Sequence, residues 1–417
     1  MTDARPTFRP IIRPLEAHEF DGWARVLTNT YGEDTDGAEL AAERAVLDLD
    51  RSLAAFDEDG EPVGGAAAHI RRLTVPGAEL PVAGVTWVGV SPTHRRRGVL
   101  TALMRRQLDD LRARGTEPIA ALRASEAGIY GRFGYGPATR GALFHADKRL
   151  LRLRPGTDLG TGTVRLLDAG RARPLVAAVY DRVRRERAGW PDRTEPFWDA
   201  RLRDDAGSRG GATALRHAVH RAADGTPDGY ALYRLKDDGE NSAVRVVEVT
   251  AATVPAYAAL WDHLIGIDLF FRLEYEGAPD EPLVHLLTDP RVARVSTVDR
   301  LWVRLVDVGR ALAARRYATP LDVVLDVRDD FCPWNAGHHR LVADGDTVSC
   351  EPTTAPADLR LSAAELGAAY LGGTTLVSLA AAGRVTELRP GALDACSTAF
   401  RGAREPFCPA GKAFPAY

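Results

Sequence analysis

Three consecutive arginines and a glycine form the stretch of this 417-residue chain whose residue types best suit ligand chemistry. The motif spans residues 95–98 (RRRG), and an apolar stripe at helical spacing follows it from Val99 to Leu108. The first backbone N–H groups of a helix have no intrahelical acceptor, and the aligned peptide dipoles place partial positive charge there. A basic turn at that place can hold an anion. A solvated basic surface is the other interpretation of the three arginines.

A buried strand precedes this turn. Residues Val85 to Val90 (VTWVGV) alternate β-branched or aromatic side chains with small ones, which is typical of a strand that buries both faces. Pro92 ends the strand. The sequence therefore predicts a strand, a basic turn and a helix in direct succession. The lysine-bearing phosphate loop of nucleotide hydrolases has another pattern, which this sequence does not contain.

Length and composition limit the possible classes of protein. A chain of this length holds two or three domains, and a net charge of −3 gives no general attraction to nucleic acid or to membranes. We find no apolar run long enough to span a bilayer and no signal-peptide pattern, so we expect a cytoplasmic protein. The four cysteines form no metal-binding spacing, which predicts free thiols and no metal site.

The sequence pattern of the first region, residues 1–155, predicts a mixed α/β layer. An edge strand at residues 9–14 is followed by helices at 15–30 and 38–49, and by a hairpin of strands at 51–57 and 63–76. The strand, turn and helix described above come next. A further buried strand, Pro118 to Arg123, precedes a short helix and turn that begin at Ser125.

Two motifs in this region carry a family resemblance. PTHRRRGVLTALMR, from Pro92, resembles the acyl-CoA pyrophosphate loop of the GNAT N-acetyltransferases, except that Leu100 stands where many members carry glycine or alanine. SEAGIYGRFGYGPAT, from Ser125, narrows the resemblance to the enhanced intracellular survival acetyltransferases of actinobacteria. The resemblance implies acetyl-CoA as cosubstrate. The residues that it assigns to the coenzyme are Val88, Gly89, Val90, Arg96, Arg97, Gly98, Val99, Leu100, Thr101, Ser125 and Glu126.

The resemblance also assigns two catalytic roles. Tyr130 matches the family's general acid, and a phenol with a pKa near 10 can protonate the departing CoA thiolate at neutral pH. An aromatic side chain that packs under the loop is the alternative for Tyr130. The family's base is the terminal carboxylate of its chain, which is here that of Tyr417. Nine residues, PAGKAFPAY, follow Cys408 in this chain. In the family, the residue that matches Cys408 lies only a few residues from the end of the chain.

The rest of the chain predicts two more domains, so we expect boundaries at 1–155, 156–305 and 306–417. The second region repeats the plan of the first, but residues 251–255 (AATVP) replace the arginine turn, which indicates a degenerate GNAT-like domain. The third region, with the alternating strand Leu321 to Arg328 and the motif WNAG, resembles a sterol-carrier-protein-like α+β domain. The expected fold is thus α/β with two tandem GNAT-like domains and this third domain.

Acidic and aromatic residues around the proposed cleft favour a cationic acceptor with primary amines. They are Glu33, Asp34, Asp36, Glu126, Trp23, Tyr31 and Trp87. The family's acceptors include aminoglycosides and lysine side chains, and its members form hexamers. We therefore expect acetyl transfer to an aminoglycoside-like polyamine by direct attack in a ternary complex. Acyl transfer to protein lysines, or a non-catalytic acyl-CoA or lipid-binding protein, are the alternatives.

Overall fold

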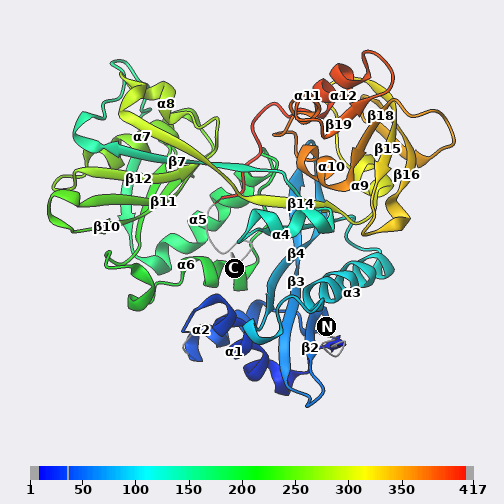
Figure 1. Ribbon diagram of the computed structural model, residues 1–417. Helices are drawn as coiled ribbons and strands as arrows, with labels where there is room; N and C mark the ends of the chain where they lie inside the picture. The colour runs from blue at the N-terminus through cyan, green and yellow to red at the C-terminus, as the bar shows by residue number, and fades with distance from the viewer. Residues whose placement is uncertain (1–8, 35–36, 410–417) are drawn as a thin grey trace.

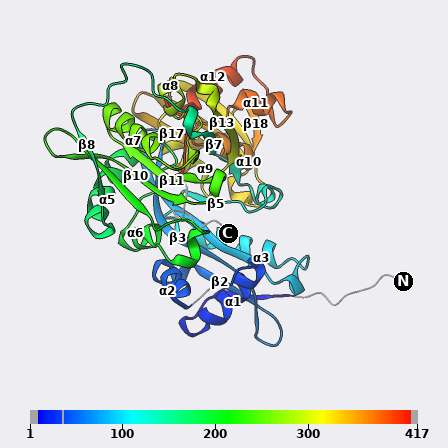
Figure 2. The same cartoon turned by 90° about the vertical axis from the view of Figure 1, so that its left-hand side faces the viewer.

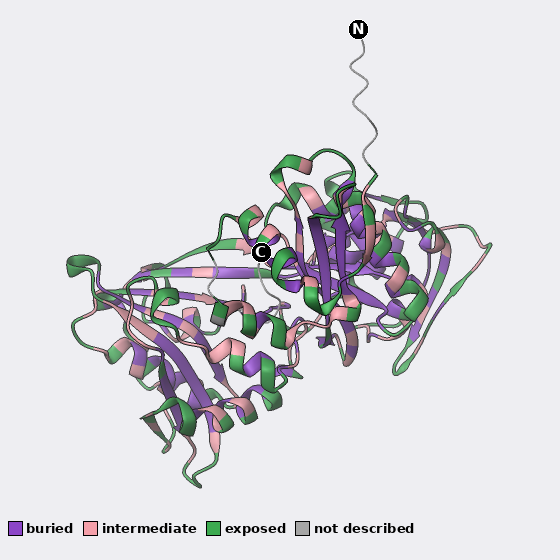
Figure 3. Cartoon of the chain, turned by 90° about the horizontal axis from the view of Figure 1, so that it is seen from below, coloured by how far each residue is buried: buried purple, intermediate pink, exposed green. Residues whose placement is uncertain are grey.

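Three β-sheets, each with its own helices, make up residues 9–34 and 37–409, the part of the chain that the computed structural model describes. Figure 1 displays them as three lobes, the first in blue and cyan, the second in green, and the third in yellow to red. The turned view agrees that the first lobe lies below the other two (Figure 2). Most strand residues are buried, whereas the outer faces of the helices are exposed (Figure 3).

The first sheet has the strand order β1-β2-β3-β4-β5-β14-β6. Its strands are β1 (Ile11–Pro14), β2 (Ser52–Phe56), β3 (Pro62–Val75), β4 (Ala78–Val90), β5 (Ile119–Arg123), β14 (Leu301–Leu305) and β6 (Gly136–Pro137). Its helices are α1 (Phe20–Tyr31), α2 (Gly37–Val46), α3 (Val99–Arg114) and the short α4 (Ala127–Tyr130). Pairing is antiparallel from β1 to β4 and parallel between β4 and β5.

Alternation along the strands sends side chains to two different helices. Ala54 of β2 packs in one apolar cluster with Trp23 of α1, whereas its neighbour Leu53 packs in another with Leu103 of α3. Since successive residues of a strand point to opposite faces, α1 and α3 cover opposite sides of the sheet. Both helices end at a glycine in the left-handed conformation, Gly32 and Gly115.

The second sheet has the order β13-β7-β12-β11-β10-β9-β8. Its strands are β13 (Ala293–Asp299), β7 (Arg140–Asp147), β12 (Arg272–Gly277), β11 (Ala243–Ala251), β10 (Pro227–Lys236), β9 (Arg216–Arg221) and β8 (Thr163–Leu167). Its helices are α5 (Ala169–Arg184), α6 (Glu195–Leu202), α7 (Val254–Gly266) and α8 (Leu283–Leu286). α5 packs on Tyr230 and Leu232 of β10, and α7 packs on Ala231 and Tyr233, so these helices also cover opposite faces.

Two strands cross the domain boundaries that the sequence predicts at residues 155 and 305. β7 lies before residue 155 but belongs to the second sheet, and β14 ends at residue 305 but belongs to the first. β7 pairs with β12 and β13 of the second sheet, and β14 returns to the first sheet between β5 and β6. The physical reason is that each of these strands forms its hydrogen bonds with strands that are more than a hundred residues away in the sequence. The first and second domains are therefore joined by exchanged strands rather than by a simple linker.

The third sheet has the order β17-β16-β15-β18-β19. Its strands are β17 (Thr347–Pro352), β16 (Gly337–Asp344), β15 (Leu321–Arg328), β18 (Leu359–Ser362) and β19 (Val385–Glu387). Its helices are α9 (Val308–Ala313), α10 (Ala363–Ala369), α11 (Leu376–Ala381) and α12 (Ala392–Phe400). The mixed α/β architecture that the sequence predicts is confirmed in all three sheets.

The third domain shares a core with the first. Helix α10 lies so close to β6 and β14 that a Cβ atom on Gly136 would meet the backbone oxygen of Ala364 at 1.9 Å. A Cβ on Gly367 would likewise meet the oxygen of Val303 at 2.2 Å. Because two glycines allow this approach, helix α10 of the third domain packs directly on β6 and β14 at one edge of the first sheet.

The four cysteines are free and buried, as their spacing predicts. Over residues 9–34 and 37–409, no helix combines the length and the apolar character that crossing a membrane requires. The same residues contain no group of three or more His, Cys, Asp or Glu side chains that could hold a metal ion.

Candidate active site

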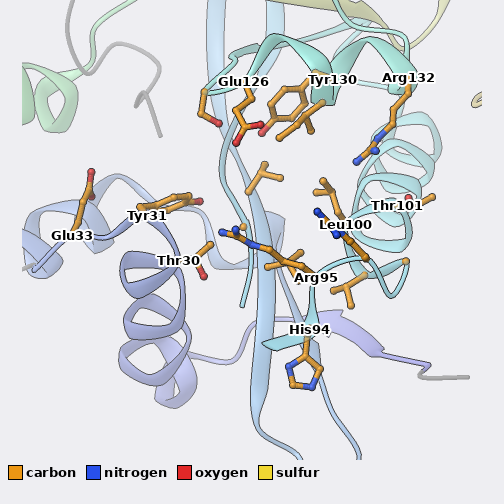
Figure 4. Close-up of a pocket in the computed structure, with 18 residues that line it drawn as sticks. Thr30, Tyr31, Glu33, His94, Arg95, Leu100, Thr101, Glu126, Tyr130 and Arg132 are labelled. Carbon is orange, nitrogen blue, oxygen red and sulfur yellow. The ribbon is translucent and has the colours of Figure 1, made fainter. Parts of the chain in front are cut away.

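A cavity of about 800 Å³ opens where the ends of β4, β5 and α1 meet the starts of α3 and α4. Figure 4 displays its lining side chains. It brings together most of the residues that the sequence assigns to the coenzyme and the acceptor. Those that line it are Tyr31, Glu33, Val88, Gly89, Val90, Arg96, Gly98, Val99, Leu100, Thr101, Ser125, Glu126 and Tyr130.

The cavity exists because two parallel strands separate. β4 and β5 pair only from Val82 with Ile119 to Gly84 with Ala121. Beyond that point β4 continues to Val90, and its other edge stays paired with β3, where Gly64 lies opposite Val90. The edge of Val88 to Val90 that faces away from β3 is thus not paired with β5. An extended, amide-bearing ligand such as the pantetheine arm of CoA could pair with it.

The start of α3 provides an anion site beside this edge. Gly98 precedes the helix with φ +83°, and Arg96 has φ +61°, so the turn enters the left-handed region twice. The first intrahelical bond there runs from Ala102 N–H to Gly98 O. No side chain in the described part of the chain caps the helix start. The N–H groups of residues 99–101 therefore have no acceptor within the helix, and this fits a diphosphate, because open space surrounds Gly98.

Tyr130 is placed where a proton donor is needed. It lies at the end of α4, and Figure 4 displays its phenol and the carboxylate of Glu126 both pointing into the cavity. Burial raises the pKa of the Tyr130 phenol to about 12, because the ionised form loses solvation. The ring of Tyr135 packs edge-on against it with ring centroids 6.1 Å apart. Tyr130 is therefore protonated at neutral pH.

Of the three aromatic residues that the sequence predicts beside the acceptor, Trp23, Tyr31 and Trp87, only Tyr31 lines the cavity. Trp23 and Trp87 pack against each other in the core between α1 and the sheet, with ring centroids 5.2 Å apart. Trp87 is only 1% exposed and has φ +53° at a β-bulge in β4, which turns its indole away from the cavity. Tyr31 does line the cavity, as Glu33 does.

Two further residues of the expected site lie elsewhere in the described part of the chain. Asp34 lines a neighbouring groove of about 540 Å³ between α1 and α2, which shares Glu33 with the cavity. Arg97 is exposed and is not part of the cavity wall. Asp36 and Tyr417 lie outside the described residues.

Sequence reasoning missed several residues of the cavity wall. They are Thr30, His94, Arg95, Ile129 and Arg132. Arg95 belongs to the arginine turn, and Arg132 follows Tyr130 by two residues, so each lies within a motif that was already noted. Two guanidinium groups on the wall add to the positive potential of the helix start, which favours the phosphates of a coenzyme.

The corresponding helix start in the second domain is closed. The hydroxyl of Thr253 accepts a hydrogen bond from Ala256 N–H at 3.3 Å, and Pro255 has no N–H to offer. Thr253 is extended, with φ −133°, so no left-handed turn precedes α7. This geometry agrees with a degenerate second domain.

The segment after α12 packs against the second domain, where Phe407 shares an apolar cluster with Tyr180 and Trp190. Phe407 N–H donates to Ala188 O at 3.0 Å, and both Phe407 and Cys408 are buried. Burial raises the pKa of the Cys408 thiol to about 11, although the charges of Arg123, Arg71 and Arg193 oppose this shift. Arg123 ends β5 two residues before Ser125, but neither Phe407 nor Cys408 is among the residues that line the cavity.

Three family models match the chain. Residues 11–138 and residues 189–305 each match an acetyltransferase (GNAT) domain, and residues 308–409 match a sterol carrier protein domain. An uncharacterized N-acetyltransferase from Streptomyces avermitilis is 45% identical, over 96% of this chain and 99% of its own. The N-acetyltransferase Eis of Mycobacterium tuberculosis is 39% identical, over 88% of this chain and 91% of its own.

A solved structure shares the whole architecture. Eis1 from Mycobacterium abscessus has a TM-score of 0.83 at 36% identity, over 96% of this chain and 100% of that chain. The separated strands, the open helix start and the matching domains define this protein as a GNAT N-acetyltransferase. The chain belongs to the Eis family of these enzymes. The expected family, enzyme class and three-domain fold are thus confirmed, and membership implies acetyl-CoA as the cosubstrate.

Proposed function

We propose that the enzyme transfers acetyl from acetyl-CoA to a primary amine of a cationic acceptor by direct attack in a ternary complex. One observation carries this proposal: the phenol of Tyr130 points into a cavity whose walls combine an open helix start with the carboxylates of Glu33 and Glu126. The first feature suits the coenzyme, and the carboxylates suit an ammonium group.

The reaction requires one base and one acid. The acceptor's ammonium first loses a proton, and the free amine then attacks the thioester carbonyl. As the tetrahedral intermediate collapses, the C–S bond breaks, and Tyr130 donates its proton to the sulfur so that CoA leaves as a thiol. The new amide nitrogen loses its extra proton to water or to the tyrosinate, which restores the neutral Tyr130. The raised pKa of Tyr130 keeps this proton in place until the thiolate forms.

For the base we propose the α-carboxylate of Tyr417, as the resemblance implies. A carboxylate with a pKa near 3.5 is ionised at neutral pH and can accept the proton directly or through water. Two observations on the described tail agree with this assignment: Cys408 is buried, and among the neighbouring charges Arg123 at the end of β5 lowers the pKa of its thiol most. A chain extended beyond Tyr417 tests it, since the extension displaces the carboxylate while leaving every side chain in place.

The coenzyme residues proposed on this geometry are those of the β4 edge, the helix start and the α4 turn. They are Val88, Gly89, Val90, Arg96, Gly98, Val99, Leu100, Thr101, Ser125 and Glu126. The acceptor side consists of Tyr31 and Glu33, and Asp34 extends it along the neighbouring groove. Because that groove continues the cavity at Glu33, an elongated polyamine of the aminoglycoside type fits better than a small amine.

An extended groove also favours a second acceptor, the lysine side chain of a protein or peptide. Release of free thiol from acetyl-CoA distinguishes the two when it is measured with aminoglycosides, with lysine peptides and without acceptor. We expect turnover with aminoglycosides and a KM that rises with salt, because carboxylates attract the acceptor. Turnover with lysine peptides alone would replace the polyamine proposal, and turnover with neutral amines alone would contradict both.

The homohexamer remains a proposal that rests on the family resemblance, and the cytoplasmic location remains a proposal that rests on the apolar pattern of the sequence. Light scattering coupled to size-exclusion chromatography measures the mass of the assembly. A mass other than six chains at micromolar concentration would contradict the hexamer.

A further inference from the structure

Five arginines surround a cleft of about 410 Å³ at the junction of the three domains. They are Arg185, Arg187, Arg316, Arg401 and Arg404, and the single acidic residue on the cleft wall is Glu186. They come from three separate segments: the residues after α5, the link between α9 and β15, and the residues after α12. The turn between β3 and β4, residues 76–77, forms the remaining wall.

Among the described residues, four of these guanidinium groups have carboxylate partners at 3.4 to 3.8 Å. Arg316 lies 3.4 Å from Asp346, and Arg185 lies 3.4 Å from Asp181. The corresponding distances are 3.5 Å from Arg401 to Glu405 and 3.8 Å from Arg404 to Glu186. Asp346, Asp181 and Glu186 are largely exposed, and such ion pairs contribute little in water.

Arg187 is the exception and serves as an anchor. It contacts Asp280 at 2.7 Å and donates to the backbone oxygen of Glu405, and its side chain is mostly buried. Apart from Glu186, the carboxylates that neighbour these arginines lie outside the cleft wall. The described cleft wall itself therefore carries five arginines and one carboxylate.

This cleft is separate from the active site. The turn at residues 76–77 is at one end of the β3–β4 ribbon, and Val90 is at the other. Because a strand rises about 3.3 Å per residue, the length of β4 places the two sites roughly 40 Å apart. Figure 1 displays this ribbon rising from the first lobe toward the space between the other two.

We propose that the cleft binds a small anion that carries at least two phosphate groups. Guanidinium groups bind phosphate oxygens through paired, charge-assisted hydrogen bonds, and arginine is better suited to this than lysine. Because the five arginines come from three segments around a cleft of about 410 Å³, a di- or triphosphate chain can contact more of them than a single phosphate group can. Inorganic polyphosphate and nucleoside phosphates share this chemistry.

Binding there would affect the segment that leads to the active site. Arg401 and Arg404 lie just before Phe407 and Cys408 in the chain, and Phe407 is hydrogen-bonded to Ala188 on the cleft wall. An anion held between these arginines, Arg316 and Arg185 joins the tail to the second and third domains. We therefore expect the ligand to raise the melting temperature of the full chain.

Calorimetric titration and thermal melting of the full-length enzyme test the proposal at low ionic strength. The probes are pyrophosphate, tripolyphosphate, ATP and CoA, with sodium sulfate at equal ionic strength as the control. We expect tripolyphosphate to bind and stabilise the protein, whereas sulfate does neither. In the variant that carries both Arg316→Gln and Arg404→Gln, we expect affinity to fall at least roughly tenfold, because two charge-assisted contacts are lost.

Arg340→Gln is the matched control, since Arg340 is an exposed arginine paired with Asp322 and lies outside the cleft. It should bind the anions as the unmodified enzyme does. Tighter binding of ATP or CoA than of tripolyphosphate, lost in the double variant, would identify a nucleotide as the ligand. Equal binding would identify the phosphate chain itself.

Three results would overturn the proposal. The first is equal affinity of the double variant and the unmodified enzyme for every probe, and the second is retention on anionic phospholipid vesicles without binding of any soluble anion. The third is a change of oligomeric state in the double variant without anion binding, because the cleft would then be an interface between copies of the chain.

Discussion

Gly84 of β4 and Ala121 of β5 form the last pair that these two parallel strands make in the described part of the chain. Beyond this pair, β4 stays on β3 while β5 pairs with β14, and the active-site cavity opens between the strands. β14 follows β13 of the second sheet almost directly and packs against helix α10 of the third domain. The site thus belongs to the first domain, but all three domains fix its geometry.

Replacement of Tyr130 by phenylalanine should lower kcat roughly 100-fold, which is within the range that general acids contribute. The KM for acetyl-CoA should change little, because the ring remains and only the proton donor is removed. Steady-state kinetics with a saturating amine measure both constants. The raised pKa of Tyr130 also predicts that ionisation of this group causes no loss of activity in the unmodified enzyme up to about pH 10.

Tyr135→Phe is the matched control for this prediction. Its ring contacts Tyr130, and its hydroxyl is buried with no hydrogen-bond partner among the described residues. Loss of that hydroxyl should leave kcat within a few-fold of the unmodified enzyme. If Tyr130→Phe behaves like Tyr135→Phe, Tyr130 is a packing residue and another group protonates the thiolate.

Gly98→Ala should weaken the binding of acetyl-CoA roughly tenfold. No atom lies within 4 Å of the added Cβ, so the effect comes from the backbone, which has φ +83° there. A left-handed conformation costs a non-glycine residue about 1 to 2 kcal/mol, so the turn should relax and its N–H groups should move away from the diphosphate. Calorimetric titration with CoA measures this loss.

Gly115→Ala provides the comparison at the other end of the same helix. Gly115 has φ +66°, and nothing lies closer than 3.9 Å to the added Cβ, so the backbone strain is similar. We expect both variants to lower the melting temperature by similar amounts and only Gly98→Ala to weaken CoA binding. Equal CoA affinities of the two variants would place the diphosphate elsewhere.

Local patterns were sufficient to predict the strand, turn and helix around Gly98 and the helix α7, because these elements depend on neighbours in the sequence. The destinations of β7 and β14 were not predictable. β14 is buried at every residue, and such a run indicates a buried strand without indicating which sheet it joins. Which sheet each strand joins depends on unpaired strand edges that are formed by residues more than a hundred positions away in the sequence.

The wall of the site shows the same limit at the level of single side chains. Trp87 was expected to face the acceptor, but a bulge opposite Ala66 gives it a positive φ and directs its indole toward Trp23. Alternation along a strand predicts that neighbours face opposite sides, but a bulge interrupts that alternation and leaves no clear signal in the sequence. Thr30 and Arg132 were missed because they reach the cavity from a helix end and a turn.

Arg193→Met should lower the free energy of unfolding by about 3 kcal/mol. Arg193 forms a bidentate pair with Glu248 at 2.9 and 2.8 Å, and both side chains are almost fully buried. Removal of one partner leaves a buried carboxylate with only Arg201 and Tyr230 to compensate its charge. Urea denaturation followed by tryptophan fluorescence measures the change.

Arg149→Met removes another bidentate arginine–carboxylate pair, at a more exposed position. Arg149 contacts Asp147 through two nitrogens, at 2.9 and 2.7 Å, but water surrounds both groups. We expect its urea midpoint to equal that of the unmodified protein. Equal urea midpoints for both arginine variants would mean that the stability of the protein depends no more on the buried Arg193 pair than on the exposed Arg149 pair.

His69 should make the protein less stable in mild acid. Burial and the neighbouring charge of Arg71 lower the pKa of His69 to about 3, against an ordinary value of 6.5. Its Nδ1 lies 3.0 Å from Val46 O, and its Nε2 has no hydrogen-bond partner among the described residues. As the pH falls below 6.5, the unfolded chain binds a proton at this position and the folded protein does not.

The stability that His69 contributes is therefore complete above its ordinary pKa and decreases as the pH falls toward 3. Between pH 7 and pH 5 this single group should reduce the free energy of unfolding by about 2 kcal/mol. In His69→Gln, an amide can still donate to Val46 O but cannot titrate, so the fall in melting temperature over this interval should be smaller than in the unmodified protein. Parallel melting curves at pH 7, 6 and 5 measure the difference, and identical pH dependence in both proteins would show that His69 is protonated within the fold.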